Sequence, residues 1–143
     1  WTLRLVGGGP EREALGKLID ERRRVELRDW VGYAELPRLY HEAAWFILPS
    51  RFEPWGLVVN EAMAAGVPVV VSDACGCAPD LVTPENGQVF PSGDEAALRA
   101  VLDALPDPDS EDWAARSSAA RERIDAFGCE AWARALIAAW AKE

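Results

Sequence analysis

The sequence contains no apolar run of membrane-spanning length, although half of its 143 residues are hydrophobic. It also contains no Lys or Arg between Phe52 and Leu98. Residues 52–143 carry a net charge of −10, compared with −9 for the whole chain. A surface that binds nucleic acid or docks on an anionic membrane needs clustered basic side chains. The first absence therefore excludes a membrane-spanning segment. The second argues against nucleic-acid binding and against membrane contact by this domain.

Cysteine and histidine are also scarce, since the sequence contains three cysteines and one histidine. Cys75 and Cys77 are separated by a single glycine, which fits neither a disulfide framework nor the spacing of a zinc knuckle. We interpret both thiols as small loop residues in a reducing, cytoplasmic compartment. His41 falls on an expected helix, far in sequence from any strand end, and is interpreted as structural. No triad of acidic metal ligands is visible, so we expect no metal and no cofactor.

Short apolar runs alternate with amphipathic segments along the chain, and this pattern is typical of an α/β fold in which helices cover both faces of a doubly wound parallel sheet. We expect one domain over residues 1–143, with 107–143 as closing C-terminal helices. The expected strands are 3–6, 25–30, 45–48, 67–71 and 88–90, and the expected helices are 10–24, 36–43, 56–65, 78–82, 95–105, 110–127 and 129–140.

Several residues are expected to begin or end these helices. Gly66 is the expected stop of the helix that starts at Gly56. Ser92 with Glu95 resembles a capping box. Ser110 is the expected cap of the next helix, and Gly128 separates that helix from the last one.

Open α/β sheets bind ligands beyond the carboxyl ends of their strands. Applied to the expected strands, this rule selects four loops, which are 7–9, 31–34, 50–55 and 72–77. The third loop lies in the most informative stretch, PSRFEPWGLVVNEAMAAGVP, at residues 49–68. Here Glu53 and Glu61 flank a glycine-containing turn that leads from a strand into a helix.

Two kinds of chemistry meet in that stretch. The N-terminus of a helix attracts anions through its free N–H groups and its dipole. A carboxylate such as Glu53 or Glu61 accepts the hydroxyls of a diol but repels phosphate. Two acids beside an anion-binding helix end therefore indicate a ligand that carries both hydroxyls and phosphates.

The same stretch, together with LRLVGGGPERE upstream and PVVVSDACGCAPDLVTPENGQVFPSGD downstream, resembles the C-terminal, donor-binding half of retaining glycosyltransferases of family 4, which have the GT-B architecture. The resemblance covers about residues 1–105 closely and the helical tail loosely. It implies a Rossmann-like domain that begins one strand and one helix too late. Trp1 also stands within an apolar strand pattern in place of an initiating Met, and no signal peptide is visible, so we expect a longer parent protein.

The resemblance implies roles for particular residues. Glu53 would lie near the donor sugar as the catalytic residue, and Glu61 would take the ribose hydroxyls. The turn between them would hold sugar hydroxyls and the diphosphate, largely through backbone N–H groups. Further donor contacts are expected from the glycine-rich loop, from the loop that borders the nucleobase, and from a basic residue. The expected donor-binding residues are Glu61, Gly56, Leu57, Trp55, Pro54, Gly8, Gly9, Gly32, Tyr33 and Arg51.

Several of these residues have simpler interpretations. Glu61 could be a solvated helix residue, and Glu53 a partner of the helix dipole. Gly8 and Gly9 could form an ordinary strand-to-helix turn, since GGG followed by Pro lacks the dinucleotide-binding spacing. Tyr33 could pack in place of stacking on a base. Trp55 could either pack beneath the site or line it, and Arg51 could be a solvated loop residue.

The resemblance implies transfer of a hexosyl group, with retention, from a nucleoside diphosphate sugar to an acceptor held by an N-terminal domain outside this chain. The domain alone would then be poorly stable and inactive. Cell-surface polysaccharide or glycolipid assembly is the most frequent role in the family, and the intact protein could associate peripherally with a membrane. The alternatives are a non-catalytic module that binds a sugar nucleotide or a protein, and another GT-B enzyme such as a sugar-nucleotide epimerase.

Overall fold

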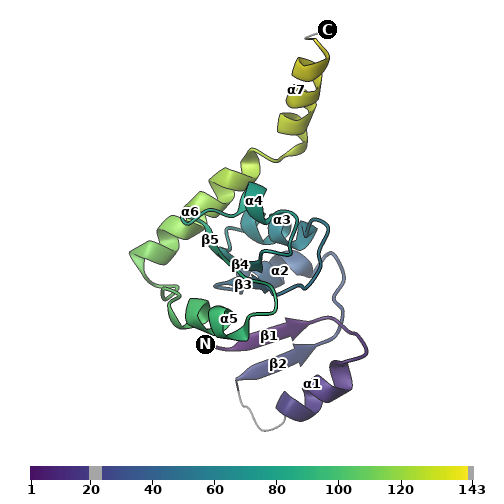
Figure 1. Cartoon of the computed structure of the whole chain (residues 1–143), viewed down its shortest axis with the longest axis vertical. Helices are drawn as coiled ribbons and strands as arrows, with labels where there is room; N and C mark the ends of the chain where they lie inside the picture. The colour runs from purple at the N-terminus through teal and green to yellow at the C-terminus, as the bar shows by residue number, and fades with distance from the viewer. Residues whose placement is uncertain (20–23, 142–143) are drawn as a thin grey trace. The chain divides into compact units, whose positions relative to one another are not determined.

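The computed structural model describes residues 1–19 and 24–141. The chain forms two compact units, Trp1–Arg38 and Leu39–Glu143, which we describe separately. Both are built from parallel strands and helices (Figure 1). The predicted α/β class is therefore confirmed. Within the described residues, no helix combines the length and the apolar character that crossing a membrane requires.

The first unit contains a two-stranded parallel sheet. Strand β1 (Leu3–Val6) pairs in parallel with β2 (Val25–Arg28), and helix α1 (Arg12–Ile19) lies between them in sequence. Arg12 donates from Nη1 to the carbonyl oxygens of Gly7 at 3.0 Å and of Arg28 at 3.2 Å, so one side chain ties together the ends of both strands. Strand β2 ends two residues earlier than predicted. Helix α1 is described as far as Ile19, and residues 20–23 lie outside the described residues. Arg24, where the sequence predicted the helix to end, lies in a turn.

The second unit contains a three-stranded parallel sheet in the order β3-β4-β5. Phe46 is paired with Val69, and Val69 with Gly87, so the strand ends lie in register at one edge. Helix α2 spans the boundary between the two units in the sequence. The elements from α2 onward are α2 (Leu36–His41), β3 (Phe46–Leu48), α3 (Leu57–Ala64), β4 (Val69–Ser72), α4 (Ala78–Leu81), β5 (Gly87–Phe90), α5 (Glu95–Asp103), α6 (Glu111–Asp125) and α7 (Cys129–Trp140).

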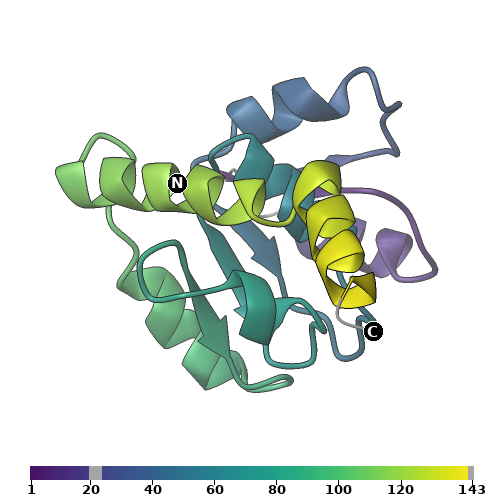
Figure 2. The ribbon, with the colours of Figure 1, turned by 90° about the horizontal axis from the view of Figure 1, so that it is seen from above.

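The core of the second unit lies between α3, α6 and one face of the sheet. Met63 of α3, Val69 and Val71 of β4, and Ala120 of α6 are completely buried in one cluster. Val70 is equally buried but points to the opposite face, because side chains alternate along a strand. Burying a Val or Met side chain contributes about 1.5–3 kcal/mol, so this central strand is a main source of stability. Figures 1 and 2 show α6 beside α3.

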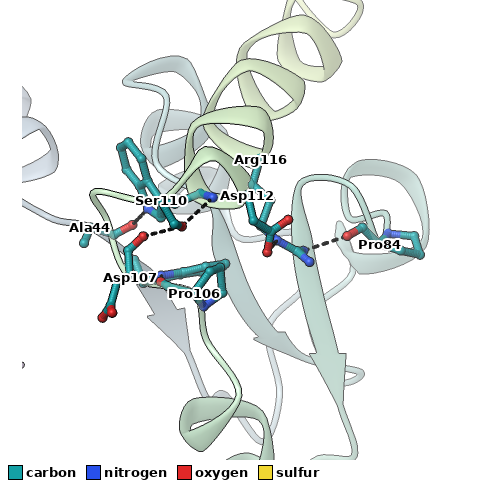
Figure 3. A network of polar contacts seen from close by, with 9 residues as sticks. Ala44, Pro84, Pro106, Asp107, Ser110, Asp112 and Arg116 are labelled. Atoms are coloured by element: carbon teal, nitrogen blue, oxygen red, sulfur yellow. Dashed lines mark hydrogen bonds and ion pairs between the residues drawn. The ribbon is translucent and has the colours of Figure 1, made fainter.

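Helix α6 is also held by polar contacts with the loops of this unit. The hydroxyl of Ser117 donates to the carbonyl oxygen of Gly66 at 2.6 Å. The Trp113 indole donates to Ala44 O at 2.7 Å, and Arg116 donates to Pro84 O at 2.7 Å (Figure 3). The cap of α6 is Ser110, as predicted, because its hydroxyl accepts a hydrogen bond from the Trp113 amide at 3.1 Å. Gly66 ends α3 and Gly128 precedes α7, also as predicted.

The predicted Ser92–Glu95 capping box is wrong. Asp94 is the cap of α5, and its carboxylate accepts a hydrogen bond from the Ala97 amide at 2.8 Å. The Ser92 amide instead donates to Asp73 Oδ1 at 2.8 Å. A capping box would need that amide for the Glu95 side chain, so loop-to-loop bonding has displaced the local motif. The fourth predicted strand also begins later, at Val69.

Candidate functional site

Three loops meet at the carboxyl edge of the β3-β4-β5 sheet. The hydroxyls of Ser72 and Ser92 both donate to the carbonyl oxygen of Ser50, at 2.6 Å and 3.2 Å. Asp73 accepts the Ser92 amide, so the loops after β3, β4 and β5 are joined through side chains. Sequence reasoning selected the first two of these loops but none of these contacts. A ligand beyond this edge would therefore meet three loops that are already joined by hydrogen bonds.

Glu53 is held by main-chain pairing with the loop after β4. Its amide donates to Ala74 O at 3.1 Å, and its carbonyl accepts the Gly76 amide at 2.9 Å. The Cys77 amide donates to Trp55 O at 3.0 Å, which continues the pairing by two residues. The Glu53 side chain is half-buried, and its Oε1 lies 3.4 Å from the Trp55 amide. The main-chain hydrogen bonds thus fix the backbone of the residue that carries the carboxylate.

Two glycines are required by the geometry of this turn. Gly56 has a φ of 98°, which favours glycine, and a Cβ there would lie 3.3 Å from both Glu53 Cγ and Leu48 Cδ2. A Cβ on Gly76 would overlap the carbonyl oxygen of Pro54. These close approaches bring the loop after β4 directly against the loop that carries Glu53.

Helix α3 begins at Leu57, and Gly56 is its cap. The cap makes no side-chain hydrogen bond to the first turn, and the Leu57 side chain is 68% exposed. The N–H groups in the first turn of a helix have no partner within the helix and carry its positive dipole end. The N-terminal end of α3 therefore lies next to Glu53, and anion binding there stays a prediction from the sequence.

Glu61 lies one turn inside α3, and its side chain is exposed. The hydroxyl of Tyr40 donates to Glu61 Oε2 at 2.8 Å. Burial first, and then the hydrogen bond and the charge of Glu61, raise the pKa of Tyr40 above its usual value, so the phenol remains a donor. Sequence reasoning missed Tyr40, because nothing local relates it to a carboxylate 21 positions away. Glu61 is accordingly fixed by a tertiary contact.

Other predicted residues of this loop differ in exposure. Trp55 is half-buried and packs against the core, with its indole N–H donating to Asn60 Oδ1 at 3.0 Å. This geometry favours the interpretation of Trp55 as packing beneath the turn. Pro54 and Arg51 are exposed, and so is Phe52, which the sequence analysis did not select.

The remaining predicted residues lie in or after the loops of the first unit. Gly8 follows β1, and a Cβ there would lie 3.2 Å from the Trp30 indole nitrogen, so this aromatic ring covers the glycine turn. Gly9 and Gly32 are exposed. Tyr33 is 88% exposed, which contradicts its interpretation as a packing residue. The exposed aromatic side chains beside these loops are thus Trp30, which sequence reasoning missed, and Tyr33.

The two loop cysteines are buried behind Glu53. The Cys75 thiol donates to Leu48 O at 3.7 Å, and the Cys77 thiol is completely buried. Burial, followed by the neighbouring Cys75, raises the pKa of Cys77 to about 11. A thiol in this state is a weak nucleophile and a poor metal ligand near neutral pH. Over the described part of the chain, no group of three or more His, Cys, Asp or Glu residues is arranged to hold a metal.

Comparison with known proteins gives consistent results. The family described as "Glycosyl transferases group 1" matches residues 1–107. Glycogen synthase of Mycobacterium tuberculosis is 35% identical over 127 residues, which is 86% of this chain and 30% of that protein.

Two solved structures are also similar. Sucrose-phosphate synthase of Thermosynechococcus elongatus has a TM-score of 0.78 and 32% identity over 99% of this chain and 38% of its own. HepE of Anabaena, in complex with UDP-glucose, has a TM-score of 0.74 and 25% identity over 86% of this chain and 35% of its own. The chain thus spans about a third of the length of these relatives.

Proposed function

The chain belongs to the group 1 glycosyl transferases, and on that premise we propose that it binds a nucleoside diphosphate sugar. The observation that carries this proposal is the arrangement of Glu53, the N-terminus of α3 and Glu61 within one unit. The two carboxylates lie before and within the same helix, and the helix end between them attracts an anion. A sugar nucleotide carries ribose hydroxyls on one side of its diphosphate and sugar hydroxyls on the other. Its hydroxyl and phosphate groups therefore follow the same order as the two carboxylates and the helix end between them.

In this proposal each residue has a distinct partner. Glu61 accepts hydrogen bonds from the ribose hydroxyls, and the α3 N-terminus with the amides of Trp55, Gly56 and Leu57 holds the diphosphate and sugar hydroxyls. Glu53 lies near the transferred sugar. The structure of HepE with UDP-glucose supports this class of ligand, because that relative spans most of this chain at 25% identity.

We propose further that the intact protein transfers the hexosyl group to an acceptor with retention of anomeric configuration. Departure of the diphosphate leaves negative charge, which preorganised donors stabilise where it develops. A helix end stabilises a nearby charge by only about 0.3–1 kcal/mol, so basic groups must assist it. Arg51 is the nearby exposed candidate in this loop. The proposal uses no resident metal ion and no cofactor, and no covalent intermediate on a carboxylate.

Saturation-transfer NMR of the intact protein with UDP-, GDP- and ADP-sugars tests donor binding. Transfer to one nucleotide that weakens in the Glu61→Ala variant would support the proposal and identify the base. A Glu95→Ala variant is the matched control, since Glu95 is an exposed glutamate at the start of α5. Absence of transfer from all three donors to folded protein would contradict the proposal and favour a non-catalytic module.

A further inference from the structure

The contact between Tyr40 and Glu61 joins two helices that are separate in sequence. Tyr40 lies on α2 and Glu61 on α3, and the phenol oxygen is 2.8 Å from Glu61 Oε2. The distance is typical of a strong hydrogen bond between a hydroxyl and a carboxylate. The contact therefore fixes one oxygen of an exposed side chain that would otherwise sample several rotamers.

The position of the Tyr40 hydroxyl is itself set by the core. The ring is half-buried and packs against the hydrophobic cluster. It meets Phe46 of β3 edge-on, with ring centroids 5.9 Å apart and an interplanar angle of 66°. Edge-to-face geometry is a favoured arrangement of aromatic pairs. The position of the hydroxyl is thus fixed by the packing of the Tyr40 ring against the core and against Phe46 of the sheet.

The bond leaves Glu61 able to bind a ligand. A carboxylate has about four lone-pair positions, of which the Tyr40 hydroxyl takes one. The remaining positions are sufficient for the two adjacent hydroxyls of a ribose. Because the side chain is exposed, a ligand reaches these positions without rearrangement of the helix.

We propose that Tyr40 is a positioning residue that orients Glu61 for the ribose diol and thereby favours ribonucleotide donors over their 2′-deoxy analogues. The inference rests on the proposed function, because it takes Glu61 as the ribose-binding residue. Preorganisation of this kind raises affinity by removing the entropic cost of ordering the side chain on binding. Its effect depends on the ligand having the 2′-hydroxyl.

The test uses the intact protein and isothermal titration calorimetry. The probes are whichever of UDP, GDP and ADP binds best and its 2′-deoxy form. Tyr40→Phe keeps the ring and its packing on Phe46 and removes only the hydroxyl. We expect this variant to lose about 5-fold in affinity for the ribonucleotide, in line with the modest net value of one hydrogen bond. Affinity for the 2′-deoxynucleotide should fall by less than about 2-fold, since this ligand keeps only one of the two hydroxyls that Glu61 accepts.

A double variant separates positioning from a purely structural role. In a Glu61→Ala background, Tyr40→Phe should have no further effect on ribonucleotide affinity, because its partner is absent. Equal losses for both nucleotides, no loss for the ribonucleotide, or an additive loss in the double variant would each overturn the inference. If the wild-type protein binds none of the nucleotides, the proposed function itself fails, and this inference fails with it.

Discussion

The amide of Gly76 donates a hydrogen bond to the carbonyl oxygen of Glu53 at 2.9 Å, so the loop after β4 holds the residue at the centre of the candidate site by its main chain. Main-chain pairing does not depend on the identity of the side chain. The Glu53 carboxylate can therefore be changed without removing the contacts that place it.

Glu53→Gln should consequently give a folded protein with little activity. We expect kcat to fall by about 100-fold or more, because the carboxylate lies beside the transferred sugar, where positive charge develops as the diphosphate leaves. The KM for the donor should change much less, because Glu61 and the start of α3 remain. Steady-state kinetics of the intact protein measures both constants. Retention of most of the wild-type kcat would remove Glu53 from the mechanism.

Gly56→Ala should disrupt the turn between the two glutamates. An alanine at this position would have to adopt the left-handed φ of 98°, and its Cβ would crowd Leu48 and Glu53. We expect a loss of at least about 1 kcal/mol in the free energy of unfolding, together with weaker nucleotide binding. The control is Gly16→Ala in α1, where a Cβ meets nothing within 4 Å. That change should be neutral or stabilising by up to about 1 kcal/mol. Similar behaviour of the two variants in thermal denaturation would contradict this explanation.

Ser117 and Ser118 form a matched pair on α6. Ser117 is buried and donates to Gly66 O at 2.6 Å, whereas Ser118 is exposed. Ser117→Ala should lower the free energy of unfolding by about 1–3 kcal/mol, because the Gly66 carbonyl loses its buried partner. Ser118→Ala should stay within about 0.5 kcal/mol of the wild type. Chemical denaturation of both variants provides the comparison, and equal stabilities would mean that the contact does not hold α6 on α3.

The buried Cys77 thiol predicts a particular pH dependence. Its pKa rises from the ordinary value of 9.0 to about 11, so the folded state favours the protonated form more than the unfolded state does. This contribution to stability is complete below about pH 9 and is lost as the pH rises from about 9 to about 11. Over that interval the free energy of unfolding should fall more steeply for the wild type than for Cys77→Ala. Parallel pH profiles of the two proteins would contradict the assignment.

The sequence predicts the fold better than the contacts within it. The order of strands and helices, the cap at Ser110 and the stop at Gly66 are confirmed, because hydrophobic periodicity and capping chemistry act over a few residues. Ser92 was assigned wrongly for the opposite reason. Its amide is taken by Asp73 from another loop, and no local pattern encodes that partner.

In the candidate site, too, the sequence predicts local features but not the contacts between distant residues. The rule for strand ends selects the loop of Glu53 and the loop of Gly76, since strand order alone determines which loops share an edge. The close approach of Gly76 to Pro54 and the bond from Tyr40 to Glu61 depend on how helices and loops pack in three dimensions. These contacts fix the backbone of Glu53 and one carboxylate oxygen of Glu61. The sequence therefore predicts which residues form the candidate site but not the contacts that hold them.

The most direct test of the account is a crystal structure of the intact protein with a bound nucleoside diphosphate sugar. We expect both ribose hydroxyls within hydrogen-bonding distance of Glu61, the diphosphate at the N-terminus of α3, and the sugar beside Glu53. A nucleotide bound with its ribose away from Glu61, or away from the carboxyl edge of the β3-β4-β5 sheet, would contradict it.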